Sequence, residues 1–199
     1  YFLWNNYIIT FKTRTFIKNI ITIEELLSWS SLKFLNNYTS NINWNLAFKI
    51  LNSLEYDSSK YSFYIKILTN NLPTMQNLNI RYSNLYTTNK CCKCSLTEDT
   101  LHILLCSKNT DNIQQSLINI TDNTLHQFQL QISSTILLNS LSLLTQHSST
   151  IQPDFLLPTI LGIYSNSIYH NIKTLLKKQT DLFLTNLSNN LLNWFYQEI

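Results

Sequence analysis

The residues whose types and spacing could do chemistry lie between positions 91 and 106. Cys91, Cys94, His102 and Cys106 form the pattern C-x2-C-x7-H-x3-C. Three thiolates and one imidazole are the ligand set of a closed, tetrahedral structural zinc site. The two-residue spacer lets one tight turn present two sulfurs to the same ion, and a spacing of four puts His102 and Cys106 on one face of a helix. The pattern therefore predicts a Zn2+ site with these four ligands.

Cys92 leaves alternatives open at this site. It could replace Cys91 as a ligand, through the less usual C-x-C geometry, or it could be a free thiol. Disulfides explain the cluster poorly, because at least one of two bridges would have to close a very short loop. A further alternative is that the four cysteines lie together in a buried loop by coincidence and have no chemical role. Clustered cysteines beside a histidine instead favour a metal and a reducing compartment, so we expect an intracellular protein, nuclear or cytoplasmic and not secreted.

Catalytic residues show no comparable pattern. No Asp-Asp pair of the kind that holds two metal ions for phosphoryl transfer occurs among the 11 acidic residues. A single Gly rules out a glycine-rich phosphate loop, and no Gly-x-Ser-x-Gly turn is present to activate a serine. We therefore expect a protein that is not an enzyme and that has no small-molecule substrate.

Basic and aromatic residues near the cluster make RNA or DNA a candidate partner. Lys90 and Lys93 accompany the first cysteines, and Tyr82 and Tyr86 could stack on bases. The last predicted helix carries a second basic group, formed by Lys173, Lys177 and Lys178. The formal net charge of +3 is too small to imply nucleic-acid binding by itself. Solvated helix faces are the alternative explanation for the lysines.

Helices joined by Asn- and Ser-rich turns are expected to position these residues, because one Gly and three Pro are too few for a turn-rich β fold. Residues 1–20 are ambiguous between helix and strand. Before the cysteines, periodicity and capping residues predict helices from about Thr13, after Thr22, over 44–51, from the Asp57 cap to before Pro73, and over 75–80. From the cysteines onward they predict helices from the cap at 97–100 to Cys106 and over 113–120, 125–144 and 155–196, the last broken near Gly162.

The expected fold is thus mostly α, with a small CCHC zinc knuckle joining two helical groups. We divide the chain into an N-terminal helical segment (1–58), a helix plus knuckle (59–108) and a C-terminal helical tail (109–199). No run of about 20 apolar residues is present, so no membrane span is expected. The first residue is not Met, which suggests a fragment of a longer protein.

Between Trp44 and Cys106 the chain carries a longer series of features around the cysteines. The series is Leu72-Pro73-Thr74, Leu78, Arg81-Tyr82, Tyr86, Cys91-x2-Cys94, Glu98 and His102-x3-Cys106. It resembles the zinc-binding region at the C-terminal end of non-LTR retrotransposon reverse transcriptases of the fungal type. Because polymerase, ribonuclease H and endonuclease motifs are missing from this chain, the resemblance covers an accessory tail and no catalytic domain.

The resemblance implies a non-catalytic region that helps to position template RNA or target DNA. Its partners would be the nucleic acid and the upstream polymerase or ribonuclease H modules of the same polyprotein. Two alternatives are a zinc-stapled structural or protein-interaction helical domain that binds no nucleic acid, and a retroelement relic without function.

Overall fold

The computed structural model describes residues 2–4, 7–9, 41–54, 57–108, 110–144, 151 and 153–198. The chain divides into two compact units, residues 1–39 and 40–199. In the first unit, β1 (Phe2–Trp4) and β2 (Tyr7–Ile9) form an antiparallel pair in which Phe2 is opposite Ile9. The helices expected from about Thr13 and after Thr22 fall outside the described residues.

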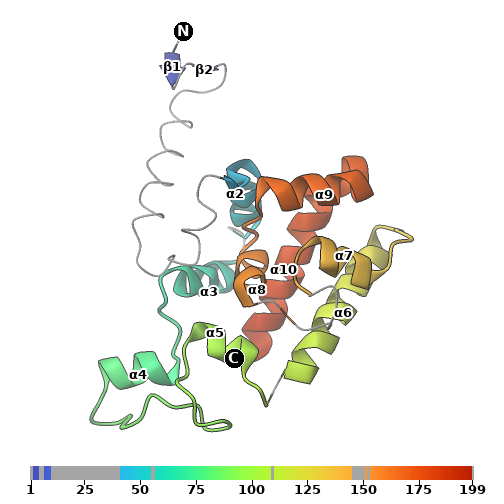
Figure 1. Ribbon diagram of the computed structural model, residues 1–199. Coiled ribbons are helices and arrows are strands. Elements are labelled where there is room, and N and C mark those ends of the chain that lie inside the picture. Colours follow the sequence, from blue (N-terminus) through green and yellow to red (C-terminus); the bar gives the residue numbers. More distant parts are fainter. Residues whose placement is uncertain are drawn as a thin grey trace. The chain divides into compact units, whose positions relative to one another are not determined.

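The second unit is helical, and the expectation of a mostly α fold is confirmed. Its elements are α2 (Trp44–Ser53), α3 (Ser58–Leu68), α4 (Met75–Arg81), α5 (Thr100–Leu105), α6 (Thr110–Gln127), α7 (Ser134–Ser140), α8 (Pro153–Ile160), α9 (Asn166–Leu176), the 3-10 turn η3 (Lys177–Gln179) and α10 (Thr180–Glu198). The cysteine-rich segment joins α4 to α5 (Figure 1). Within the described residues, no helix combines the length and the hydropathy that crossing a membrane requires.

Helix α10 is the centre of this unit. It packs against α2 and α3, which precede the cysteines, and against α6, α8 and α9, which follow them. In Figure 1 it runs from α9 at one end of the unit to α5 at the other. Its apolar side chains recur at helical spacing, so one broad face is buried. The fully buried members of that face are Phe183, Leu184, Leu187, Leu191, Leu192 and Phe195.

Aromatic and polar contacts orient α10 within the core. Phe195 meets Phe63 of α3 edge to face, with ring centroids 5.5 Å apart. The Ser188 hydroxyl donates to the carbonyl oxygen of Thr159 at 3.1 Å, so its own oxygen is left to accept from the Tyr164 hydroxyl at 2.7 Å. Because an unpaired hydroxyl is costly to bury, these bonds favour one rotation of α10 over its alternatives.

Short polar residues begin the helices where the sequence indicates. The side chains of Asn43, Asp57 and Thr74 accept hydrogen bonds from main-chain N–H groups in the first turns of α2, α3 and α4. Each bond satisfies an N–H group that has no partner inside its helix. The helices predicted from residue 44, from the Asp57 cap and over 75–80 are therefore confirmed.

The helix ends show how a chain with one Gly turns. After α3, α6, α7 and α8 the next residue but one is left-handed, namely Asn70, Gln129, Ser142 and Gly162, with φ between 52° and 69°. Around each, two N–H groups bond back to carbonyls of the preceding helix in the Schellman pattern, for example Leu130 to Leu125 at 3.0 Å and Gln129 to His126 at 3.0 Å. Three of these four positions carry a side chain where Gly is usual.

Three predicted helices are wrong in their extent, and the first of them, over 113–120, is part of α6, which runs unbroken to Gln127. The helix expected over 125–144 is interrupted, because the left-handed Gln129 ends α6 and α7 begins only at Ser134. The break expected near Gly162 is confirmed. A Cβ at Gly162 would lie 2.7 Å from Ile50 Cγ2, so this position needs Gly for space as well as for its φ. A further break at Lys177 separates α9 from α10 and was not expected.

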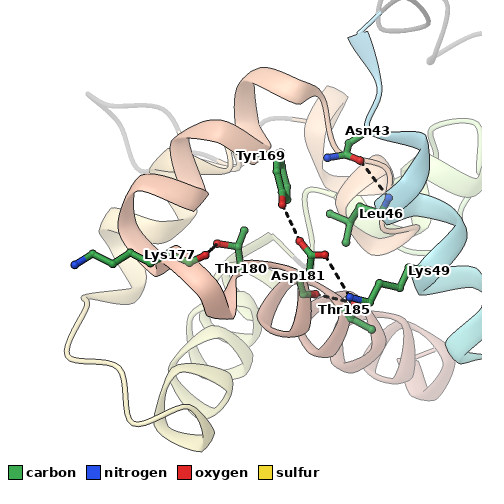
Figure 2. A network of polar contacts seen from close by, with 8 residues as sticks. All are labelled: Asn43, Leu46, Lys49, Tyr169, Lys177, Thr180, Asp181 and Thr185. Carbon is green, nitrogen blue, oxygen red and sulfur yellow. Dashed lines mark hydrogen bonds and ion pairs between the residues drawn. The ribbon is translucent and has the colours of Figure 1, made fainter. Parts of the chain in front are cut away.

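A polar network ties α2, α9 and α10 together on the surface (Figure 2). The Asp181 carboxylate accepts a hydrogen bond from the Tyr169 hydroxyl at 2.8 Å and pairs with the Lys49 ammonium group at 3.3 Å. Burial raises the pKa of Asp181, but the bonds from Tyr169 and Lys49 outweigh it and leave the pKa below its ordinary value. The network therefore stabilises the fold only while Asp181 is ionised.

We predict that Gln129→Gly stabilises the protein by about 0.5–1 kcal/mol, because Gly removes the cost of a left-handed side chain and loses only part of it to chain entropy. The matched control is Asn70→Gly at the same position of another helix end. Asn70 Oδ1 accepts a hydrogen bond from Thr100 Oγ1 at 3.0 Å, so this change gains no stability. Urea midpoints at equal m value measure both. A lower midpoint for Gln129→Gly would contradict the strain argument.

For Asp181→Asn we predict a stability loss that depends on pH. A carboxyl with a lowered pKa stabilises the fold above its ordinary value of 3.8, and the contribution disappears as pH falls further. The variant is therefore less stable than the natural chain at neutral pH, by less than about 1 kcal/mol for such an exposed pair, and the difference shrinks in acid. Asp122→Asn, on the exposed side of α6, is the control of equal charge. Denaturant unfolding between pH 7 and pH 3 measures the difference.

Candidate metal centre

The four predicted ligands meet at one place. One donor atom from each of Cys91, Cys94, His102 and Cys106 lies within 4.8 Å of every other. The Cys91 and Cys106 sulfurs are 3.9 Å apart, and Cys94 Sγ lies 3.1 Å from His102 Nε2. Cys91 belongs to this group, whereas Cys92 is exposed and outside it. These four side chains could bind a metal ion.

A tight turn presents the first two sulfurs. The Cys91 carbonyl accepts from the Ser95 N–H at 2.9 Å, and Cys91 N–H bonds to the Leu96 carbonyl at 2.7 Å. Ser95 is left-handed, with φ 63°, which closes the turn in little space. The Lys93 N–H points back to Cys91 Sγ at 3.4 Å. Main-chain N–H groups that face a sulfur in this way stabilise a thiolate.

Helix α5 supplies the other two ligands. Asp99 begins it by accepting a hydrogen bond from His102 N–H at 2.6 Å, as the sequence predicts for the 97–100 segment. His102 lies within the helix, whereas Cys106 lies just after its last residue. Leu104 is buried in the core. The core therefore holds α5 in place, and α5 holds His102 and Cys106 toward the turn.

Electrostatics at the cluster differ from one sulfur to the next. The Lys93 N–H is the main cause that lowers the pKa of Cys91, to about 7, against the effect of burial. The Leu96 N–H lowers the pKa of Cys94, but burial and the neighbouring Cys106 and Cys91 sulfurs outweigh it and raise that pKa. A second thiolate is thus harder to form beside the first, and a cation between the sulfurs would remove that repulsion.

One side of the cluster borders a cleft of about 710 Å³. Cys91, His102 and Cys106 line one part of it, and Ile113 of α6 and Trp194 of α10 line another. The cleft therefore adjoins three of the four candidate ligands. Trp194 is half-buried near the end of α10. Only the packing of α10 shows that it borders this cleft, and no local signal in the sequence could have shown it.

The predicted nucleic-acid residues fall into two separate groups. Tyr82, Tyr86 and Lys90 are exposed on residues 75–90, which we call the arm, and Lys93 is exposed in the cysteine turn that follows. In Figure 1, α4 of the arm extends beyond the packed helices, far from the junction of α9 and α10. That junction carries the second basic group, in which all three side chains are exposed: Lys173, Lys177 and Lys178.

We predict that the protein binds one metal ion per chain and that Cys94→Ser abolishes this binding, because three donors hold an ion much less well than four. Cys92→Ser is the matched control, since it removes an adjacent thiol that lies outside the cluster. Elemental analysis after purification under reducing conditions measures the stoichiometry. A loss of metal in Cys92→Ser would show that the ligand set is assigned wrongly.

Comparisons of the chain with protein-family models, with curated proteins and with solved structures find no match. The assignment of these four residues as candidate metal ligands therefore rests on the donor set and its geometry.

Proposed function

We propose that this chain is a non-catalytic, zinc-binding accessory region of a non-LTR retrotransposon reverse transcriptase that helps to position template RNA or target DNA. The observation that carries the proposal is the convergence of three sulfurs and one imidazole nitrogen within 4.8 Å. Ligands at about 2.0–2.3 Å from a tetrahedral zinc ion lie roughly 3.3–3.8 Å from one another. The 3.9 Å between the Cys91 and Cys106 sulfurs is close to that value.

The donor set supports a structural ion over a catalytic one. A catalytic zinc keeps one position for water or substrate, whereas four protein ligands fill a tetrahedral ion. Zinc held by Cys91, Cys94, His102 and Cys106 would act as a staple between the cysteine turn and α5. Three thiolates and a divalent cation leave a local charge of −1, so the ion itself does not attract phosphate.

Nucleic-acid binding is supported by the arm and the turn that follows it. Tyr82 is 56% exposed and Tyr86 is 36% exposed, so their rings are accessible for stacking on unpaired bases. Lys90 and Lys93 lie on the same segment and carry the positive charge that a phosphate chain requires. Aromatic rings interleaved with cations are typical of surfaces that bind single strands. Single-stranded RNA is therefore the form of nucleic acid that we favour.

A second candidate function has its own observation. Ile80, Leu85 and Leu96 are 72%, 78% and 61% exposed on the same segment. Exposed large aliphatic side chains are a feature of surfaces that contact proteins. If these aliphatic side chains form the main binding surface, the region is a zinc-stapled protein-interaction domain. Its proposed origin in a retrotransposon then suggests the upstream modules of the same polyprotein as the partner.

We predict that the full chain binds a labelled single-stranded RNA and that Lys90→Ala/Lys93→Ala weakens this binding. The double variant loses two phosphate contacts, so the slope of log binding constant against log salt concentration should become shallower by about 1.4. Lys177→Ala/Lys178→Ala is the control, because it removes the same charge at the other basic group. Tyr82→Ala should cost about 1–3 kcal/mol of binding with little change in slope.

Fluorescence anisotropy over a range of salt concentrations measures all three variants. A larger effect of the Lys177/Lys178 control would show that the wrong basic group is assigned. No binding of single-stranded RNA or duplex DNA at low salt would favour the protein-interaction function instead.

A further inference from the structure

Glu98 connects the cysteine turn to the start of α4. It lies four residues after Cys94 and four before His102, so the chain on both sides of it leads to a ligand. Its Oε1 accepts a hydrogen bond from Met75 N–H at 3.0 Å, and its carbonyl oxygen accepts from Gln76 N–H at 3.1 Å. The sequence gives no reason to expect this contact, because Met75 and Glu98 are distant along the chain.

The contact matters because α4 is a short helix. Its first N–H groups have no partner inside the helix. Glu98 satisfies those of Met75 and Gln76, and Thr74 Oγ1 satisfies that of Asn77 at 3.2 Å. A helix of seven residues is not stable alone in water. The fold of α4 therefore depends on groups outside it, and two of its three caps come from the segment that bears the metal ligands.

A second anchor of α4 does not involve that segment. Asn77 is the buried residue of α4, and its Nδ2 donates to the carbonyl oxygens of Asn70 at 2.7 Å and Leu72 at 2.8 Å. Ile80, one turn further, is 72% exposed, so apolar packing adds little at this end of the helix. Arg81 of the last turn donates from its guanidinium group to Asn71 Oδ1, so Asn77 and Arg81 hold α4 on the α3 side and Glu98 holds its start on the side of the cysteine-rich segment.

We propose that Glu98 is a positioning residue through which the metal ion controls the fold of α4 and of the arm. With an ion bound, Cys94 and His102 fix the segment on both sides of Glu98, so its carboxylate and carbonyl remain at the start of α4. Without the ion these two points are released, so α4 loses the Glu98 cap and keeps its Asn77 and Arg81 contacts with residues 70–72. The consequence for RNA rests on the proposed function, because Tyr82 and Tyr86 follow α4, whereas the consequence for α4 does not.

The coupling operates in both directions, as linkage requires. If the ion orders α4, then a partner that orders α4 and the rest of the arm raises the affinity of the site for the ion. The same linkage applies to the Glu98 cap. If metal binding stabilises α4 through this cap by a given factor, then removal of the cap weakens the affinity for the metal by the same factor. A cap of about 1 kcal/mol corresponds to a factor of about five. Nucleic-acid binding and metal retention would then reinforce each other.

Hydrogen exchange of the full chain in saturating zinc tests the proposal. In Glu98→Ala, the amides of Met75–Arg81 should exchange about fivefold faster than in the natural chain, while those of α10 are unchanged. Glu98→Gln keeps an acceptor oxygen at the same place and should exchange as the natural chain does. Unchanged exchange of α4 in zinc-bound Glu98→Ala would overturn the proposal.

Chelation of the natural chain provides the second measurement. Removal of the ion should speed exchange of Met75–Arg81 by at least the factor seen in Glu98→Ala. Equal protection of α4 with and without metal would show that the Asn77 and Arg81 contacts suffice and would overturn the proposal. Both measurements need no nucleic acid, so a failure to bind RNA would refute the proposed function and leave this inference standing. If RNA binds, Glu98→Ala should weaken it while the salt slope stays constant.

Discussion

Repulsion among closely spaced sulfurs is the constraint on which the middle of this structure depends. Three sulfurs and an imidazole nitrogen lie within 4.8 Å of one another. As thiols they form an ordinary polar cluster, but as thiolates they cannot remain together without a cation. The pKa of Cys91 is lowered and that of Cys94 is raised, so one thiolate forms readily and a second one beside it does not. The cysteine turn and α5 bring these four donor atoms together.

The core of the unit has a different origin, which is burial of the apolar face of α10. Helices from both sides of the cysteines pack against it. Fully buried Leu187 and Phe183 show that this packing is dry and close. The cluster of candidate ligands lies near one end of α10, where Trp194 borders the cleft. The unit therefore combines a core built on α10 with an arm that contacts the cysteine-rich segment through Glu98.

The cluster and several helix starts could be predicted from the sequence, because local chemistry determines them. A C-x2-C turn needs only neighbouring residues, and Asp57 or Thr74 caps the helix that begins beside it. The helix end at Gln129 could not be predicted. Gln has no special preference for the left-handed region, and only packing at both sides of the turn makes that conformation worth its cost. The role of Glu98 depends on Met75, which is too distant in sequence for any local pattern to connect them.

The central position of α10 has a consequence for the order in which the structure forms. The cysteine turn and α5 are close in sequence, so their contacts close small loops at little entropic cost. Contacts of α2 and α3 with α10 join segments more than a hundred residues apart, and such contacts form slowly. Contacts within residues 91–106 therefore cost less chain entropy to form than those that close the core. Until α10 docks, the apolar faces of α2 and α3 remain uncovered and available for association with other unfolded chains.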